Sequence, residues 1–236
     1  MREVVAGIYQ VSLPRRGVHV NAFLVAGDSL ALVDAGVPGS STRLLSAFGE
    51  IGRDPSELQF VAITHHHVDH IGGLASIVQQ TGAGVVADAK EVPIIEGTVP
   101  PPPKIGRTWG SRLRISLSAR LGATSARPVA VQHQLQDDAV LLGCGLRAIH
   151  TPGHTAGHLA YVHSDSGTLF VGDAAANLLG RLTKPIANHD EDYEEMVASI
   201  GKLAALDIDT ACFGHGRLIK RGARRRLNEL AEKLGR

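Results

Sequence analysis

The chain contains few cysteines, with only two among its 236 residues. Cys144 and Cys212 lie far apart in the sequence, and neither has a partner at the spacing of a cysteine metal motif. These counts argue against a disulfide framework and against a zinc finger. Two isolated cysteines are instead typical of a protein whose thiols stay reduced in the cytosol.

An excess of charge of one sign and a long apolar run are also missing. Lys and Arg number 24 and Asp and Glu number 23, so the formal net charge is +1, and we expect no general attraction to nucleic acid or membranes. The sequence contains no run of about 18 apolar residues, so we expect no transmembrane helix. The first residues carry no apolar core of signal-peptide length. We therefore expect a cytoplasmic protein.

The composition that is present, 44% hydrophobic and 20% charged, is that of a globular protein with a substantial core. Short apolar runs alternate with segments of helical spacing, and each half has strands followed by helices. This order suits two sheets flanked by helices. Strands are expected at residues 8–13, 18–26, 30–34, 58–63, 84–87, 139–142, 146–151, 158–163, 168–171 and 210–213. Helices are expected at residues 39–51, 71–80, 89–96, 192–206 and 222–234.

Residues 97–136 differ from the rest because they contain six basic residues and no acid. The segment opens with four prolines, and apolar residues then recur every fourth position from Ile105 to Leu121, which predicts an amphipathic helix. Three interpretations stay open. The helix packs on the body with a solvated arginine face, or it forms a lid with Trp109 and Leu113 facing a substrate, or it makes a membrane-surface or dimer contact.

Metal-ligand residue types cluster directly after the predicted buried strand at 58–63. The cluster consists of His65, His67, Asp69 and His70. Imidazole and carboxylate groups suit zinc, iron or manganese. A solvated polar turn is the alternative, but four such residues within six, between an apolar strand and an apolar helix, argue against it.

Three later residues follow apolar runs in the same way, and each has a glycine beside it. They are His154, Asp173 and His215. Ligand sites in α/β proteins gather at the carboxyl ends of strands, and glycine lets the backbone turn tightly beside a ligand. Taken alone, each of the two histidines would fit a capping or core role. Asp173 taken alone would fit a helix N-cap. Together with the first cluster they make seven ligands, the number that suits two ions sharing one bridging carboxylate.

The order HxHxDH, GH, GD and GHG resembles the metallo-β-lactamase superfamily, and the resemblance runs from about residue 7 to about residue 232. It implies an α/β fold, a four-layer αβ/βα sandwich of two mixed β-sheets flanked by helices. We expect residues 1–236 to form a single domain of this kind, with a basic lid-like insertion at 97–136.

The resemblance also implies a role for each ligand and two divalent metal ions. His65, His67 and His154 would bind the first ion, and Asp69, His70 and His215 the second, with Asp173 bridging both. Zinc is the expected metal, with iron or manganese as alternatives. The ions would lie about 3.5–4 Å apart and share a hydroxide that attacks the substrate. Asp69 is the expected catalytic residue, because it would orient the hydroxide and protonate the leaving group.

Three other histidines receive weaker expectations. His66 is expected to point away from the ions, because its neighbours occupy the ligand positions. His158 is expected to support the site or the core rather than to bind metal. His189 follows Asp173 on a segment that could border the cleft.

The function implied is that of a binuclear metal hydrolase that cleaves an ester-like bond, such as a lactone or thioester, in a small-molecule substrate. The motifs most resemble the hydroxyacylglutathione hydrolase and acyl-homoserine lactonase branches. The stretch after His215 is shorter than the helical domain of the first branch, which argues against glutathione thioesters.

Several alternatives stay open. A persulfide dioxygenase would hold one iron with His65, His154 and Asp173. An RNA-processing nuclease has only the basic segment in its favour, and we expect no nucleic acid partner. A β-lactamase is disfavoured because the sequence shows no leader. A non-enzymatic sensor or scaffold is disfavoured because every expected ligand is present. A homodimer stays open.

Overall fold

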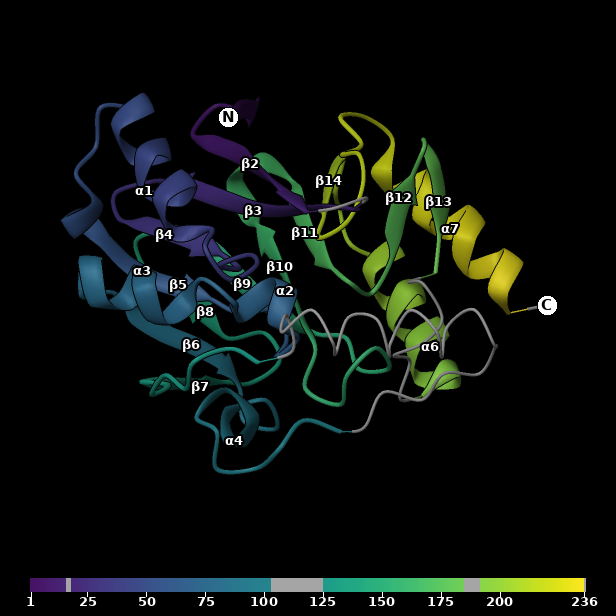
Figure 1. Cartoon of the computed structure of the whole chain (residues 1–236). Coiled ribbons are helices and arrows are strands. Elements are labelled where there is room, and N and C mark those ends of the chain that lie inside the picture. The colour runs from purple at the N-terminus through teal and green to yellow at the C-terminus, as the bar shows by residue number, and fades with distance from the viewer. Residues whose placement is uncertain (16–17, 103–124, 185–191, 236) are drawn as a thin grey trace.

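The computed structural model describes residues 1–15, 18–102, 125–184 and 192–235 (Figure 1). The expected helical stripe with Trp109 and Leu113 lies outside these residues, and so does His189. The lid interpretation of the basic segment and the cleft position of His189 therefore stay predictions.

The first sheet has seven strands in their sequence order. The first four strands pair antiparallel, whereas β4 to β7 pair parallel, so the sheet is mixed. Its strands are β1 (Arg2–Val5), β2 (Ile8–Arg15), β3 (Val18–Ala26), β4 (Leu30–Val33), β5 (Leu58–Ala62), β6 (Gly84–Asp88) and β7 (His133–Leu135).

The second sheet has five strands in the order β14-β11-β10-β9-β8. They are β8 (Val140–Leu141), β9 (Leu146–His150), β10 (Leu159–His163), β11 (Thr168–Gly172) and β14 (Thr210–Phe213). Because β11 pairs parallel with β14 and antiparallel with β10, and β10 pairs antiparallel with β9, strands β9, β11 and β14 run in one direction. Their carboxyl ends therefore meet at one edge. A separate hairpin joins β12 (Ala176–Leu178) to β13 (Arg181–Thr183).

Helices cover the outer face of each sheet, with α1 and α3 beside the first sheet and α6 and α7 beside the second (Figure 1). The helices and helical turns are α1 (Ser41–Glu50), η1 (Pro55–Glu57), α2 (Val68–Ile71), α3 (Leu74–Thr81), α4 (Val92–Ile95), η2 (Ser164–Ser166), α6 (Tyr193–Ala204) and α7 (Ala223–Leu234). Within the described residues, none of these helices has the length and apolar content needed to cross a bilayer.

Because successive side chains along a strand point to opposite faces of the sheet, apolar side chains form three layers, one between the sheets and one on the outer face of each sheet. In β3, Leu24 packs toward α1 and α3 while Phe23 packs toward the second sheet. In β11, Leu169 packs toward α6 and α7 while Phe170 packs toward the first sheet. The rings of Phe23 and Phe170 meet with centroids 5.3 Å apart. The expected four-layer sandwich of two mixed sheets flanked by helices is thus confirmed.

The helix expected at residues 71–80 is instead two short helices, α2 and α3, separated by Gly72 and Gly73. The break follows from a close approach of two chain segments. A β-carbon added at Gly73 would lie 2.4 Å from the carbonyl oxygen of Ala35. The amide of Ala35 also donates to the carbonyl of His70 at 2.7 Å. The loop after β4 therefore fixes the direction in which α2 presents its side chains.

Four short strands were not expected from the sequence: β1, β7, β12 and β13. Each has at most four residues, too few for a clear alternating pattern. Residues 133–135, at the end of the basic segment, form β7 and pair with β6 at the edge of the first sheet. The last part of that segment is therefore built into the sheet.

Replacing Tyr161 with phenylalanine should destabilise the fold. The buried hydroxyl of Tyr161 in β10 donates to the carbonyl of Ile63 at the end of β5, at 2.8 Å, and so joins the two sheets. Its loss leaves that buried carbonyl without its hydrogen bond, at a cost of about 1–3 kcal/mol. Urea denaturation measures the change, with Tyr193→Phe as the control, because Tyr193 is 41% exposed. Equal stability of the two variants would contradict this inter-sheet role.

Candidate metal centre

The seven candidate ligands come together at one edge of the sandwich, where strands from both sheets end. The turn after β5 carries His65 and His67, and α2 carries Asp69 and His70. The loops after β9, β11 and β14 carry His154, Asp173 and His215. The common direction of those three strands is the physical reason for the convergence, because it brings their carboxyl ends to the same edge.

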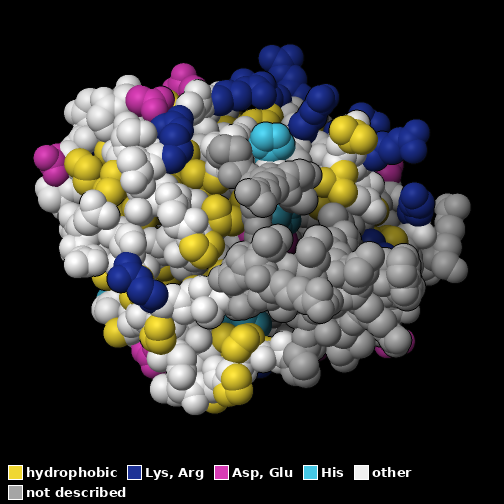
Figure 2. Space-filling model, in the orientation of Figure 1, with side chains coloured by type: hydrophobic (Ala, Val, Ile, Leu, Met, Phe, Trp, Pro, Cys, Tyr) yellow, Lys and Arg dark blue, Asp and Glu magenta, His cyan; other side chains and the backbone are white. Residues whose placement is uncertain are grey.

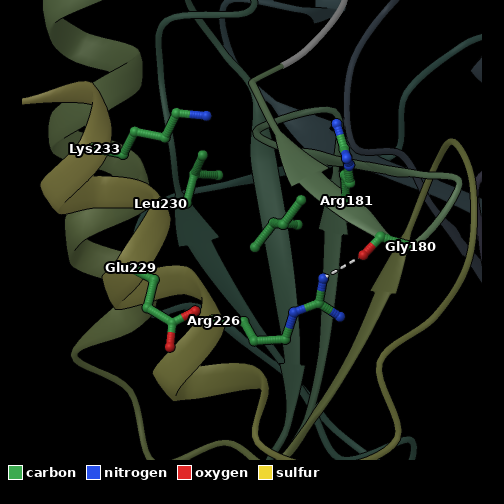
Figure 3. Close-up of a pocket in the computed structure, with 7 residues that line it drawn as sticks. Gly180, Arg181, Arg226, Glu229, Leu230 and Lys233 are labelled. Atoms are coloured by element: carbon green, nitrogen blue, oxygen red, sulfur yellow. Dashed lines mark hydrogen bonds between the residues drawn. The ribbon is translucent and has the colours of Figure 1, made fainter.

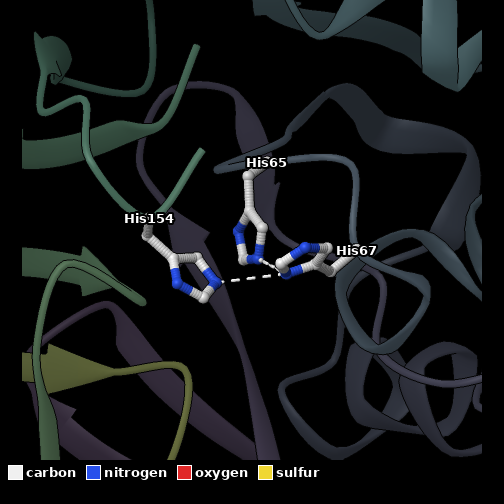
Figure 4. A group of neighbouring side chains, drawn as sticks. All are labelled: His65, His67 and His154. Atoms are coloured by element: carbon white, nitrogen blue, oxygen red, sulfur yellow. Dashed lines mark hydrogen bonds between the residues drawn. The ribbon is translucent and has the colours of Figure 1, made fainter. Parts of the chain in front are cut away.

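One group of donors consists of His65, His67 and His154, whose ring nitrogens point toward one another (Figure 4). The Nδ1 atom of His67 lies 2.9 Å from Nε2 of His65 and 3.1 Å from Nε2 of His154. Three imidazoles from two sheets that face one common point can all direct lone pairs at a shared cation.

A second group consists of Asp69, His70 and His215, whose donor atoms lie within 4.8 Å of one another. The Nε2 atom of His215 lies 3.6 Å from a carboxylate oxygen of Asp69. This group combines two imidazoles with one carboxylate, a donor set that also suits a divalent ion.

Asp173 lies between the two groups. Its Oδ2 atom is 3.6 Å from Nε2 of His154 and 3.2 Å from Nε2 of His215, while Oδ1 is 3.5 Å from Nε2 of His70. Burial acts to raise the pKa of Asp173, but the nearby imidazoles of His215 and His70 hold it well below its usual range. An ionised carboxylate therefore touches members of both groups.

Two buried atoms test whether the site fits a metal. Among the described residues, Nε2 of His70 and Oδ1 of Asp173 are buried and form no hydrogen bond, although they face each other. Buried polar atoms are normally satisfied, and leaving them unsatisfied costs about 1–3 kcal/mol each. A cation between these imidazole and carboxylate donors would satisfy both atoms. The residues present therefore fit divalent metal ions.

Asp34 orients His70 from behind. Its Oδ2 atom lies 2.7 Å from Nδ1 of His70, and its Oδ1 atom accepts a hydrogen bond from the amide of Thr64 at 2.9 Å. With Nδ1–H donated to a carboxylate, Nε2 is left as the acceptor that faces the site. Asp34 adopts φ +61°, a strained conformation for a residue other than glycine. Asp34 was not expected at the site from the sequence, although it directly follows the apolar run at 30–33.

His158 supports Asp173 rather than joining a donor group. Its Nε2 atom accepts a hydrogen bond from the amide of Asp173 at 3.0 Å, and its Nδ1 atom lies 2.8 Å from the hydroxyl of Thr151. Burial, assisted by the charge of His154, lowers the pKa of His158 to about 3. The neutral ring can therefore accept at Nε2 and donate at Nδ1. This geometry agrees with the supporting role expected for His158.

Asn21 holds the loop that carries His215. Its side-chain amide donates to the carbonyls of Phe213 and Gly216, both at 3.0 Å. Its backbone amide donates to the carbonyl of Gly214 at 2.9 Å. Because Asn21 lies on β3 and the loop follows β14, these bonds tie the first sheet to the end of the second.

His66 turns away from the donor groups, as expected, and its ring meets the buried carboxylate of Glu91. Glu91 also accepts hydrogen bonds from the loop that carries His154. Glu91 was not expected at the site, because a single glutamate beside a short helical segment forms no recognisable motif.

A different hollow lies between β13 and α7 and shares no residue with the donor groups (Figure 3). Leu182 and Leu230 line it together with basic side chains, and Arg226 donates to the carbonyl of Gly180 at 2.7 Å. Lys and Arg side chains also gather along one side of the surface in Figure 2. This hollow holds one acid, Glu229, and no histidine, so its donors do not match those of the candidate metal centre.

The fold and the site together define a class of protein: a four-layer α/β sandwich with clustered metal donors at the edge between its sheets. The chain belongs to the metallo-β-lactamase superfamily, whose family model matches residues 15–215. The resemblance stated from the sequence motifs is therefore confirmed.

Two relatives illustrate the range of similar proteins. A probable metallo-hydrolase, YflN of Bacillus subtilis (strain 168), is 28% identical over 249 residues, covering 98% of this chain and 92% of that protein. A hydroxyacylglutathione hydrolase of Albidiferax ferrireducens is 31% identical over 183 residues, covering 75% of this chain and 55% of that enzyme. This chain therefore spans about half of the second relative's length. The family and these relatives support the assignment of this chain as a metallo-hydrolase.

Solved structures agree with the fold. The metallo-β-lactamase family protein TTHA1429 from Thermus thermophilus has a TM-score of 0.70 and 25% identity, covering 98% of this chain and 80% of that chain. TTHA1623, whose structure was determined in a di-iron-bound form, has a TM-score of 0.66 and 25% identity, covering 89% of this chain and 93% of that chain.

Replacing Gly214 with alanine should disturb the donor groups. A β-carbon at residue 214 would lie 2.5 Å from Oδ1 of Asp173 and 2.7 Å from Cε1 of His70, so one of these side chains must shift. We expect metal affinity to fall by about 10–100-fold, as when groups that orient ligands are disturbed, measured by competition with a chromophoric chelator. Gly201→Ala in α6 is the control, since nothing lies within 4 Å of its added β-carbon. Wild-type affinity in Gly214→Ala would contradict the assigned geometry.

Proposed function

We propose that this protein is a binuclear metal hydrolase that cleaves an ester-like bond, a lactone or a thioester, in a small-molecule substrate. The observation that carries the proposal is the position of Asp173, whose carboxylate reaches both donor groups at 3.2–3.6 Å. A carboxylate in that position suits two ions better than one. Residues 1–236 are proposed to form one domain around this site.

The proposed ligand assignment follows the two donor groups. His65, His67 and His154 would hold one ion and Asp69, His70 and His215 the other, while Asp173, which lies near members of both groups, would contribute to both. Zinc is the proposed metal because the donors are mostly imidazole. Iron is the alternative, since a similar structure was determined with two irons.

Divalent ions at such a site supply a Lewis acid and lower the pKa of the water they bind toward about 7. The acidic side chains of the site would then carry the proton transfers. The side chain of Asp69 is 24% exposed, compared with 9% for Asp173. Asp69 is therefore the carboxylate that can take a proton from water and return it to a leaving group, whereas Asp173 stays fixed.

Relatives with a named activity point to an ester-like bond as the target. Hydroxyacylglutathione hydrolases, named for a thioester substrate, match this chain over part of their length. We therefore propose an ester-like bond as the target and do not propose glutathione as the carrier. Lactones and simple thioesters are the substrates to screen first.

Metal content per chain tests the binuclear assignment. Protein expressed without added metal should contain about two equivalents of zinc or iron by elemental analysis. His67→Ala should lose about one equivalent, because His67 belongs to one donor group. His133→Ala, in the exposed part of β7, should keep the wild-type content. One equivalent of iron in the wild type, with oxygen uptake on persulfides, would replace the hydrolase proposal by the dioxygenase alternative.

Asp69→Asn tests the proton-transfer role. The variant should lower kcat/KM on the best lactone or thioester by about 10²–10⁴-fold, the usual contribution of a positioned acid or base. Thermal unfolding should stay close to that of the wild type because the side chain is partly exposed. Asp165→Asn, outside the donor groups, is the matched control. Full activity in Asp69→Asn would show that the catalytic assignment is wrong.

A further inference from the structure

Glu91 is a buried carboxylate that lies outside both donor groups. It precedes α4 as its N-terminal capping residue, and it is only 2% exposed. A buried carboxylate costs free energy unless its oxygens are well hydrogen-bonded. Its partners therefore indicate what it does in the fold.

One oxygen of Glu91 holds the turn after β5. Its Oε2 atom accepts a hydrogen bond from the amide of His66 at 2.7 Å and lies 2.5 Å from Nδ1 of the same residue. His66 is flanked in the chain by the proposed ligands His65 and His67. Fixing both the backbone and the ring of His66 restricts where its two neighbours can point.

The other oxygen holds the loop after β9. Its Oε1 atom accepts from the hydroxyl of Thr155 at 2.7 Å and from the amide of Gly157 at 3.0 Å. Thr155 follows the proposed ligand His154 directly. A β-carbon at Gly157 would lie 2.8 Å from that same oxygen, so glycine permits the close approach of this loop.

A single carboxylate thus fastens two loops that come from different sheets. The donor group of His65, His67 and His154 is built from these same two loops, and His67 meets His154 across them at 3.1 Å. The other group, Asp69, His70 and His215, takes no residue from the loop after β9. Glu91 is therefore placed to affect one donor group more than the other.

We propose that Glu91 is a positioning residue that sets the spacing of the donor group formed by His65, His67 and His154. The inference rests on the proposed function, because it takes those histidines as ligands of one ion. Four donors on two oxygens use the acceptor capacity of a carboxylate, and charged acceptors form the stronger hydrogen bonds. Glutamine has the same shape, but its amide nitrogen would face donors on one of the two loops.

Cobalt titration of metal-free protein tests the inference, because cobalt absorption depends on the ligands and the geometry around each ion. Glu91→Gln should weaken the binding of one ion by about 10–100-fold, as expected for groups that orient metal ligands, and should alter its absorption bands. The second ion should bind as in the wild type. Glu96→Gln is the matched control, since Glu96 follows the same short helix and accepts from the amide of Val131 at 3.0 Å.

Thr155 provides a milder variant in case Glu91→Gln does not fold. Thr155→Val removes one bond to Glu91 and should weaken the same ion to a smaller extent, while Thr155→Ser restores the hydroxyl and should rescue binding. If Glu91→Gln and Thr155→Val each bound both cobalt ions with the affinities and spectra of the wild type, the positioning role of Glu91 would be overturned, but the proposed function would not. A wild-type protein that binds no cobalt would overturn the proposed function as well.

Discussion

The carboxylate of Asp173 is the group on which the rest of the candidate site depends. An ionised carboxylate buried at this edge is costly unless cations or donors surround it. Three imidazoles approach it, and none of them comes from its own strand. The neighbouring residues keep this arrangement in place. His158 holds its backbone amide, and Gly214 leaves room for its Oδ1 atom.

The apolar interior brings the two sheets together but does not fix the positions of their loops within a fraction of an ångström. Apolar contacts are non-directional, whereas hydrogen bonds demand particular distances and angles. Polar ties between the sheets therefore cluster near the donor groups. Asn21 reaches the loop after β14, Tyr161 reaches the end of β5, and Glu91 joins the loops after β5 and β9. The donor positions follow from these directional contacts.

Much of this arrangement could be predicted from the sequence because it depends on local patterns. Apolar runs mark the longer strands, and the spacing of His65, His67, Asp69 and His70 marks a candidate ligand turn. Asp34 and Glu91 could not be predicted in this way. Each is a single carboxylate whose partners lie 25 to 66 residues away, and only the folded chain brings them together. The break between α2 and α3 likewise depends on the approach of Ala35, which no local pattern contains.

The two donor groups differ in how far solvent reaches some of their side chains. His65 and His154 are 0% and 3% exposed, whereas the side chains of His215 and Asp69 are 16% and 24% exposed. Each group also has a member of the other kind, since His67 is half-buried and His70 is 0% exposed, so the group that Glu91 fastens is more buried only by degree. The side chain of Asp69 is the most exposed of the first four residues, and a partly exposed carboxylate can exchange protons with bulk water. Under the proposed function, the group of His65, His67 and His154, which Glu91 fastens, would fix the geometry of the site, and the partly exposed Asp69 in the other group would handle the protons.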